Sequence, residues 1–465
     1  MTRSMSKSCR EGSSTSLSLL FSEHSDTFLH AATTSFTYIR SPHSMKRTIL
    51  LLLLPIAFYA AASQVPKVRT GIEVLRDRNF DVLKGKRVGL ITNPTGVDSK
   101  LKSTVDILHE ATDVKLVALF GPEHGVRGDF EGGDTVDTFI DQRTGIPAYS
   151  LYGRTAKPTP EMLQGIDVLV YDIQDIGCRS YTYISTMGLA MEAAAERNIQ
   201  FVVLDRPNPL GGVRIEGNLA EEAFRSNISK YPIPYVYGLS CGELAKLLNE
   251  ERMLPGGKKC SLTVVPMKGW TRDMTFAETG LLWVPTSPHI PSESSPFYYV
   301  STGILGELQV ISEGVGYTTP FRILAAEWID PNLLANSMNA LNLPGVLFRP
   351  MFFKPFYGMH KGKELKGVQI HITDETKVDL MSIQFLFMSV HNNLYPDKNP
   401  FLLADTSRLR SFDKATGTDQ IRKRFMKRMS FDDIKEYLRK DVDGFRALSK
   451  KYYLYGASGG KRVKK

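Results

Sequence analysis

The feature that most constrains this fold is a series of short apolar runs, each followed by a loop rich in glycine, proline and polar residues. Six runs lie at residues 87–92, 114–120, 147–151, 167–171, 199–204 and 262–266, and helical periodicity marks residues 101–110, 181–197 and 240–252. Apolar runs of this length are typical of strands that are buried on both faces. Strands that alternate with helices predict an α/β fold, a Rossmann-like, doubly wound and mostly parallel sheet.

The second apolar run leads directly into a charged turn at residues 121–125, Gly-Pro-Glu-His-Gly. Open α/β sheets bind ligands at the carboxyl ends of their strands, so this turn brings Glu123 and His124 to a position where a ligand is expected. Four charged residues follow between glycines: Arg127, Asp129, Glu131 and Asp134. A loop of this composition is able to bend closely around a small polar ligand.

Polar and charged residues also follow the other strands of the predicted sheet. They are Asn93 after the first strand, Asp172, Asp175, Arg179, Tyr181 and Tyr183 after the fourth, and Asp205, Arg206 and Asn208 after the fifth. In a parallel sheet these ends share one edge, so we expect one cleft in which the carboxylates and arginines converge. Loops that only connect elements have no need of such residues.

The length of the chain and the change in amino-acid composition after Trp270 predict two domains. Four prolines fall between residues 285 and 296, which is typical of a rigid, irregular crossing. We therefore expect a Rossmann-like catalytic domain at 65–285 and a smaller α+β domain at 286–465 that closes the cleft. In the second domain we expect helices at 304–313, 321–328, 331–341, 380–394 and 430–452, and strands at 346–353 and 367–372.

The N-terminal 64 residues resemble an over-extended reading frame followed by a secretory signal. Met45-Lys46-Arg47 precedes a short apolar core, and residues 61–63 form a small-residue cleavage site. We expect the mature chain to begin near Gln64, in the periplasm or outside the cell, without stable membrane insertion. Removal of the N-terminal 64 residues lowers the formal net charge from +9 to +6, because six basic and three acidic residues are lost.

Charge and cysteine content exclude some classes of protein. The modest positive charge suits an anionic polymer such as the cell wall, and no basic stripe suggests nucleic acid. Three cysteines would remain in the mature chain, Cys178, Cys241 and Cys260, so no disulfide framework holds the fold. The sequence does not indicate an oligomeric state.

The sequence motifs of several classes of enzyme are absent from the chain. The chain has no G-x-G-x-x-G turn after the first strand, no phosphate-binding P-loop and no G-x-S-x-G elbow, so we expect no nucleotide cofactor and no serine hydrolase. A metal site built from His124, Asp172, Asp175 and Asp205 stays open as an alternative. Paired histidine spacing does not support it, and no metal is expected.

Carboxylates and arginines in an exported protein favour glycan chemistry. Cleavage of a glycosidic bond needs a protonated carboxyl for the leaving oxygen and a second group that stabilises the oxocarbenium-like carbon. Glu123 is the candidate acid. Arg179 or Arg206 suits recognition of a substrate carboxylate, and either is equally suited to a structural ion pair.

Five motifs together resemble those of the exo-β-N-acetylmuramidase family, long catalogued as a domain of unknown function. They are Gly-Pro-Glu-His-Gly at 121–125, Tyr-Asp-Ile-Gln-Asp-Ile-Gly at 171–177, Arg-x-Tyr-Thr-Tyr at 179–183 (one-letter x for any residue), Asp-Arg-Pro-Asn-Pro at 205–209 and Ser-Pro-His-Ile-Pro at 287–291. The resemblance covers about residues 71–455. It departs at 314–317, Gly-Val-Gly-Tyr, where many relatives carry Gly-Arg-Gly-Thr.

The resemblance implies a Rossmann-like domain, a smaller C-terminal domain and an active site between them. It also implies release of N-acetylmuramic acid from the non-reducing ends of peptidoglycan fragments composed of N-acetylmuramic acid and N-acetylglucosamine, with Glu123 as the catalytic glutamate. On this interpretation His124, Asp172 and Asp175 position the acid or the sugar. Arg179 or Arg206 binds the lactyl carboxylate. The retained alternatives are a non-catalytic cell-wall glycan-binding protein and a metal-dependent amidase or deacetylase acting on the same polymer.

Overall fold

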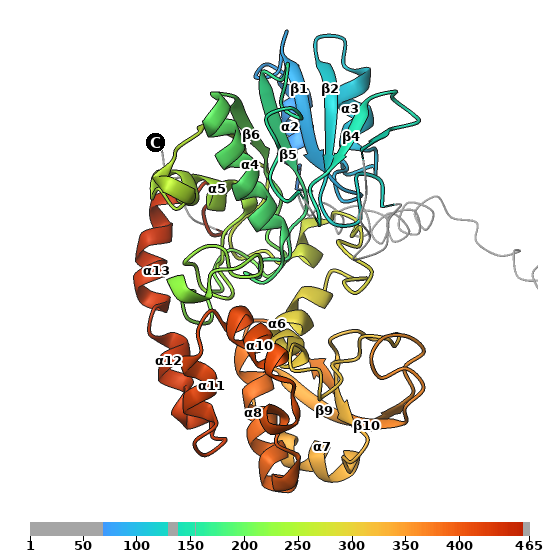
Figure 1. Cartoon of the computed structure of the whole chain (residues 1–465), viewed down its shortest axis with the longest axis vertical. Coiled ribbons are helices and arrows are strands. Elements are labelled where there is room, and N and C mark those ends of the chain that lie inside the picture. The colour runs from blue at the N-terminus through green and yellow to red at the C-terminus, as the bar shows by residue number, and fades with distance from the viewer. Residues whose placement is uncertain (1–67, 129–137, 154, 459–465) are drawn as a thin grey trace, which may run out of the picture. The chain divides into compact units, whose positions relative to one another are not determined.

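The computed structural model describes residues 68–128, 138–153 and 155–458. Its larger sheet has seven strands in the order β3-β4-β2-β1-β5-β6-β7, in which only β3 runs antiparallel to its neighbour (Figure 1). The strands are β1 (Arg87–Thr92), β2 (Lys115–Gly121), β3 (Phe139–Ile140), β4 (Pro147–Ser150), β5 (Val168–Asp172), β6 (Gln200–Leu204) and β7 (Ser261–Val265). The mostly parallel sheet expected from the apolar runs is confirmed.

Helices cover both faces of this sheet, as a doubly wound fold requires. They are α2 (Gly71–Asp77), α3 (Thr104–Glu110), α4 (Tyr183–Arg197) and α5 (Cys241–Glu250). Side chains of α2 and α3 pack with Val168 and Val170 of β5, whereas those of α4 and α5 pack with Leu169 and Tyr171. Alternate residues of one strand therefore enter two separate cores, which explains its uninterrupted apolar sequence.

Local capping fixes where α5 begins. The Ser240 hydroxyl accepts a hydrogen bond from the Glu243 amide at 3.2 Å, and the Ser240 amide donates to the Glu243 carboxylate at 3.1 Å. This is the reciprocal capping box that the spacing of the two residues predicts. The cap ties the start of the helix to the carboxyl edge of the sheet, because the Ser240 hydroxyl also donates to Asp205.

A smaller antiparallel sheet, in the order β8-β10-β9, belongs to the second part of the chain. Its strands are β8 (Ile323–Ala326), β9 (Val346–Phe353) and β10 (Leu365–Ile372), and the helices α6 (Ser295–Gly306), α7 (Pro331–Asn339) and α8 (Leu380–Leu394) contribute to its core. The α+β character is confirmed. The helix expected at 321–328 is wrong, because the short run Ile-Leu-Ala-Ala pairs with β10 and a short apolar run does not distinguish strand from helix.

The helix expected at 430–452 is also wrong, because this segment forms short pieces. The C-terminal helices are α9 (Pro400–Leu403), α10 (Thr406–Thr416), α11 (Gln420–Phe425), α12 (Lys435–Arg439) and α13 (Val442–Ser449). Phe445 of α13 and Tyr452 after it pack in the core shared by α4 and α5, so the end of the chain returns to the larger sheet (Figure 1). The boundary near residue 285 stays a prediction.

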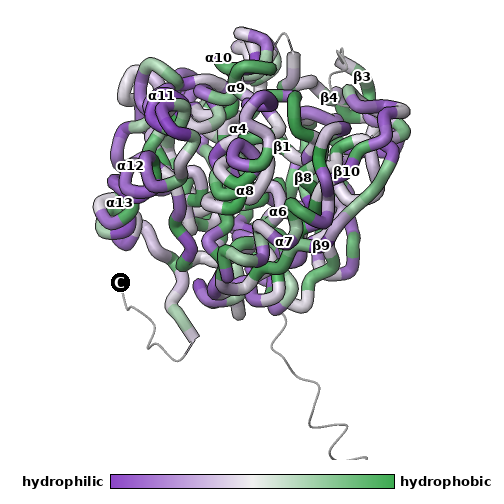
Figure 2. Tube along the Cα trace, turned by 90° about the horizontal axis from the view of Figure 1, so that it is seen from below, coloured by the Kyte–Doolittle hydropathy of each residue, from purple (hydrophilic) through white to green (hydrophobic). Residues whose placement is uncertain are grey.

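Hydrophobic residues concentrate along α8 and β8, whereas α11 and α12 carry many hydrophilic residues (Figure 2). Among the described residues, no helix is long and apolar enough to cross a membrane. Cys178, Cys241 and Cys260 are buried free thiols. The expected signal segment and the three acidic residues Asp129, Glu131 and Asp134 lie outside the described residues.

Candidate active site

The turn after β2 holds Glu123 and His124 in a constrained backbone. A Cβ atom added to Gly121 would lie 2.8 Å from the Val126 nitrogen, so the chain folds back here as closely as glycine permits. His124 has φ of 74°, in the left-handed region that non-glycine residues rarely adopt. Such conformations persist where the surrounding structure enforces them and are found often at functional sites.

Both side chains line a hollow of about 910 Å³. This volume is in the range of ligand-binding pockets. The lining comes from the larger sheet, from the 287–290 segment and from the second part of the chain: Glu123, His124, Tyr152, Ser180, Tyr181, Thr182, Tyr183, Ser287, Pro288, His289, Ile290, Tyr299, Phe321 and Tyr357. We refer to this hollow as the Glu123 cleft.

Tyrosines form one wall of the Glu123 cleft. The Tyr181 hydroxyl is 2.7 Å from the Thr286 hydroxyl, and the Tyr183 hydroxyl donates to the Thr286 carbonyl. The rings of Tyr181 and Tyr183 meet edge to face at 5.0 Å, and Tyr181 meets Tyr299 at 5.9 Å. Burial raises the pKa of both Tyr181 and Tyr183, so this wall is made of neutral phenols held in place.

Two phenols lie near the Glu123 carboxyl, and two imidazoles of the same cleft lie near each other. Burial, and next the neighbouring Glu123 carboxylate, raises the pKa of Tyr152. The charge of Glu123 also contributes to the raised pKa of Tyr183, although burial is the main cause. Burial and then the charge of His124 lower the pKa of His289. Among the described lining residues, Glu123 is the only carboxylic acid.

Asp172 and Arg206 lie at the carboxyl ends of the strands as expected, but they bind each other. Arg206 Nε is 2.5 Å from Asp172 Oδ1 and Nη2 is 2.9 Å from Oδ2, with both residues buried. The sheet order reverses between β1 and β5, which is where open sheets bind ligands. Here the hollow lined by Arg206 and its neighbours measures only about 20 Å³.

Asp205 and Asn208 are used in the same structural way. The Asp205 carboxylate accepts hydrogen bonds from the Ser240 hydroxyl at 2.7 Å, the Gly242 amide at 2.7 Å and the Tyr455 hydroxyl at 2.5 Å. Asn208 donates to the Leu239 carbonyl and accepts from the Leu210 amide, both at 3.0 Å. These contacts join the loop after β6 to the start of α5 and to the C-terminal segment.

Arg179 is fully buried and joins three distant segments of backbone. It donates to the carbonyls of Asn218 and Ile233 at 2.7 Å, to that of Ala415 at 3.1 Å and to the Ser229 hydroxyl at 3.1 Å. Burial lowers its pKa to about 10. The two arginines expected to bind a substrate carboxylate, Arg179 and Arg206, therefore have internal partners.

Arg127 and Asp175 also have internal partners. Arg127 binds Asp141 at 2.6 Å and Asp106 at 3.2 Å, and its hydrogen bond lowers the pKa of Asp141 to about 2. Asp175 accepts from the Tyr237 hydroxyl and from the Gly177 amide, and burial raises its pKa to about 7. The ion pair between Arg127 and Asp141 anchors the loop that follows Glu123.

Asn93 lies behind the tyrosine wall. Its side-chain oxygen accepts from the amide and the hydroxyl of Thr95, at 3.0 and 2.5 Å. Its amide nitrogen is buried without a hydrogen-bond partner among the described residues, and the Tyr183 hydroxyl is its neighbour. Of the residues selected from the sequence, Glu123, His124, Tyr181 and Tyr183 are thus the ones that line the cleft.

The other lining residues are not among the candidates that the sequence indicates. The motif at 287–291 supplies Ser287 and His289, and its sequence alone indicates no role for either. Tyr152 directly follows the apolar run at 147–151, so its place after a strand end is a signal visible in the sequence. Tyr299, Phe321 and Tyr357 carry no spacing signal, since they come from a helix and two loops far away in the chain.

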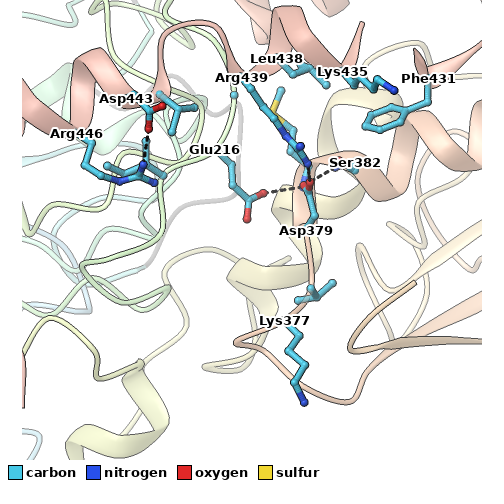
Figure 3. Close-up of a pocket in the computed structure, with 15 residues that line it drawn as sticks. Glu216, Lys377, Asp379, Ser382, Phe431, Lys435, Leu438, Arg439, Asp443 and Arg446 are labelled. Atoms are coloured by element: carbon cyan, nitrogen blue, oxygen red, sulfur yellow. Dashed lines mark hydrogen bonds and ion pairs between the residues drawn. The ribbon is translucent and has the colours of Figure 1, made fainter. Parts of the chain in front are cut away.

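A second hollow, of about 370 Å³, lies between the start of α8 and the helices α12 and α13 (Figure 3). Its charges are largely matched within the protein: Arg439 Nη2 is 2.8 Å from Asp379 Oδ2, and Arg446 Nη1 is 2.7 Å from Asp443 Oδ1. Ligand recognition at this position would have to displace these pairs. The Glu123 cleft is therefore the better candidate.

Within the described ranges, no group of three His, Cys, Asp or Glu side chains is placed to hold a metal ion. The set considered from the sequence, His124 with Asp172, Asp175 and Asp205, does not come together, because each aspartate has the separate partners given above. The residues present offer hydrogen bonds and a single carboxyl acid instead.

A doubly wound sheet whose carboxyl edge bears a polar, aromatic-walled cleft with one acidic side chain is the architecture of an enzyme that acts on a small polar ligand. Residues 88–294 match the family described as exo-beta-N-acetylmuramidase NamZ, N-terminal, and residues 297–455 match its C-terminal counterpart. The chain belongs to the exo-β-N-acetylmuramidase NamZ family. The family indicated by the five sequence motifs is thereby confirmed.

Three relatives agree with this assignment. The chain is 47% identical over 390 residues to a Bacillus subtilis (strain 168) protein described as peptidoglycan beta-N-acetylmuramidase NamZ, covering 84% of this chain and 92% of that protein. Two crystal structures of DUF1343 family proteins from Bacteroides fragilis NCTC 9343 share the fold. They are 58% and 29% identical, with TM-scores of 0.80 and 0.65, and each alignment covers 84% of this chain and 99% of the other.

Proposed function

We propose that this protein is an exo-acting glycosidase that releases N-acetylmuramic acid from the non-reducing ends of peptidoglycan fragments. Membership of the β-N-acetylmuramidase family supports the reaction class. The observation that carries the assignment to a site is the position of Glu123, half-buried at the end of β2 among phenols and imidazoles in the Glu123 cleft. The substrate is a chain of N-acetylmuramic acid and N-acetylglucosamine.

Glu123 acts as the general acid. Its carboxyl proton passes to the glycosidic oxygen as the bond between that oxygen and the anomeric carbon breaks, and the leaving sugar departs as a neutral alcohol. Water then adds to the anomeric carbon and returns a proton to the Glu123 carboxylate. Proton and charge therefore balance over one turnover.

The second catalytic group is the acetamide of the substrate. A two-carboxylate mechanism needs another Asp or Glu about 5 to 9.5 Å away. Glu123 is the only one among the described residues that line the cleft. The acetamide carbonyl oxygen of N-acetylmuramic acid is suited to stabilise the anomeric carbon in place of that carboxylate, with the phenols of Tyr152 and Tyr183 beside the acid.

Recognition of the lactyl carboxylate falls to the imidazoles and hydroxyls of the cleft. Arg179 and Arg206, the earlier candidates, are buried in internal contacts. His124 and His289 offer ring nitrogens in the lining, and Ser287 offers a hydroxyl. These groups account for a preference for N-acetylmuramic acid over N-acetylglucosamine, which lacks the carboxylate.

The setting of the reaction follows from the substrate. Because peptidoglycan lies outside the cytoplasm, we also propose that the segment at 45–63 directs export and that the mature chain begins at about Gln64. In this proposal residues 65–285 form the catalytic domain, and residues 286–465 form a second domain that completes the cleft. Tyr299, Phe321 and Tyr357 of the latter lie in the lining.

The test is the release of chromophore from an aryl β-N-acetylmuramide and from the matching N-acetylglucosaminide. Wild type and Glu123→Gln are compared, each with and without EDTA. We expect cleavage of the muramide alone, lost in Glu123→Gln and indifferent to EDTA. No chromophore release by folded wild type, together with EDTA-sensitive hydrolysis of an amide bond in muropeptide, would instead support a metal-dependent amidase or deacetylase. Binding of muropeptide without turnover by folded wild type would support a non-catalytic glycan-binding protein.

A further inference from the structure

The loop between β9 and β10, residues 354–364, carries two large aromatic side chains on the protein surface. Phe356 is 55% exposed and Tyr357 is 40% exposed. Isolated exposed apolar residues are common and need no explanation. These two, however, belong to a continuous series of ring contacts.

The series runs outward from the Glu123 cleft. The rings of His289 and Tyr357 are stacked, with centroids 5.9 Å apart and planes 12° apart. Tyr357 contacts Phe356 at 5.5 Å, and Phe356 contacts Tyr317 at 6.1 Å. We call His289, Tyr357, Phe356 and Tyr317 the aromatic row.

The aromatic row is held in place by the backbone of the 314–317 turn. The Phe356 amide donates to the Gly316 carbonyl at 2.9 Å, and the Gly362 amide donates to the Pro355 carbonyl at 2.8 Å. Gly316 has φ of 95°, and a Cβ on it would lie 2.2 Å from the Tyr357 carbonyl oxygen. A loop held this closely presents its rings in one orientation, which reduces the entropy cost of binding.

The inner end of the row belongs to the reaction site. His289 and Tyr357 line the same cleft as Glu123, and the charge of His124 contributes to the lowered pKa of His289. Phe356, farther along the row, is exposed to solvent. A path of rings therefore leads from the acid to the surface.

The proposed exo mode of action, on which the following inference rests, determines which sugar contacts Phe356 and Tyr357. An exo-acting enzyme encloses the terminal sugar, so the rest of the glycan has to leave through the mouth of the cleft. Any platform at that mouth faces the leaving side of the scissile bond. The apolar C–H face of a pyranose ring buries its surface well against an aromatic ring.

We propose that Phe356 and Tyr357 form a binding platform for the sugars on the leaving side of the scissile bond. The first of these is the N-acetylglucosamine that departs when N-acetylmuramic acid is released. The platform selects oligosaccharides over single sugars. It contributes to affinity and to the orientation of the glycosidic oxygen toward Glu123.

The experiment measures binding in the Glu123→Gln background, which keeps the substrate intact. The probes are free N-acetylmuramic acid and a tetrasaccharide of alternating N-acetylmuramic acid and N-acetylglucosamine, with the former at the non-reducing end. We expect Phe356→Ala and Tyr357→Ala to weaken tetrasaccharide binding by about fivefold to tenfold each. Binding of the free sugar stays unchanged in Phe356→Ala, because Phe356 does not line the Glu123 cleft, and Tyr357→Phe keeps the wild-type affinity for the tetrasaccharide.

Leu402→Ala is the matched control, because Leu402 is 74% exposed and belongs to α9 rather than to the cleft lining. Tetrasaccharide affinity unchanged in both ring variants would overturn the platform. An equal loss for both probes would also overturn it, since the rings would then act on the terminal sugar. Unchanged sugar binding with a dimer in wild type and a monomer in the variants would make this surface a self-association site instead.

Failure of the proposed function is distinguishable from failure of the platform. If wild type hydrolyses no tetrasaccharide while its binding still depends on the two rings, the platform holds and the glycosidase assignment falls. If wild type releases N-acetylmuramic acid from the tetrasaccharide with the same KM as the ring variants, the assignment holds and the platform falls.

Discussion

The Arg206 guanidinium and the Asp172 carboxylate form a two-point ion pair at the switch point of the sheet, with Nε to Oδ1 at 2.5 Å and Nη2 to Oδ2 at 2.9 Å. Arg206 also donates to the Val97 carbonyl at 2.9 Å, and the Thr104 hydroxyl donates to Asp172. A site that could receive a ligand in this fold is thus occupied by side chains that join the loops after β1, β5 and β6.

Removal of one member of this pair should destabilise the fold. Arg206→Met leaves the Asp172 carboxylate buried without its partner, and we expect the free energy of unfolding to fall by about 3 to 5 kcal/mol. Urea denaturation measures it. The double variant Arg206→Met with Asp172→Leu should recover part of the loss, because no unpaired charge remains. Arg446→Met breaks the surface pair with Asp443 and serves as the control, with no measurable change expected. Equal stability of wild type and Arg206→Met would contradict the structural role.

Asp175 should make stability fall as the pH rises. Burial raises its pKa in the folded protein to about 7, from 3.8. Between these values the folded state binds more protons at Asp175 than the unfolded state, so the contribution of Asp175 to stability is greatest below pH 4 and declines to pH 7, by at most about 1.4 kcal/mol per pH unit. Asp175→Asn should remove this decline. The measurement is urea unfolding of both proteins from pH 4 to 8, and parallel curves would refute the prediction.

His391 should act in the opposite direction. Its ring Nε2 accepts a hydrogen bond from Trp328 Nε1 at 3.0 Å, and burial lowers its pKa from 6.5 to about 4. The unfolded state therefore binds the proton first, and stability falls as the pH decreases from 6.5 to 4. His391→Gln keeps an acceptor for Trp328 and should flatten this limb, so that the decline caused by Asp175 becomes steeper in the same unfolding series. An unchanged limb would mean that His391 is already protonated in the folded state.

The sheet was predictable because each strand of a doubly wound fold enters two cores and leaves an uninterrupted apolar run. Glu123 and His124 were predictable because a Gly-Pro break must end such a run at a known edge. The roles of Asp172, Arg179, Asp205 and Arg206 were not, since a charged residue at a strand end has the same sequence signal whether its partner is a ligand or another side chain. Only the folded contacts separate the two cases.

The second part of the chain shows a different limit. The short run Ile-Leu-Ala-Ala at 323–326 becomes β8 because β10 is available to pair with it. The local sequence does not indicate this pairing. Tyr299 and Tyr357 reach the cleft from α6 and from a loop, 58 residues apart in sequence. Tertiary packing brings them together, so no spacing rule would have found them.

Tyr152 should assist Glu123 without itself transferring the proton of the leaving group. The phenol lies beside the Glu123 carboxylate, whose presence, after burial, raises the pKa of Tyr152. Tyr152→Phe keeps the ring and removes the hydroxyl, so we expect kcat for muramide cleavage to fall by about tenfold, KM to change little and the alkaline limb of the pH profile, which reports loss of the general acid's proton, to move. Tyr149→Phe, in β4 three residues before Tyr152 and packed against Phe120, is the control and should keep the wild-type rate and profile. A Tyr152→Phe enzyme with an unaltered kcat and pH profile would show that the phenol only fills space beside the acid.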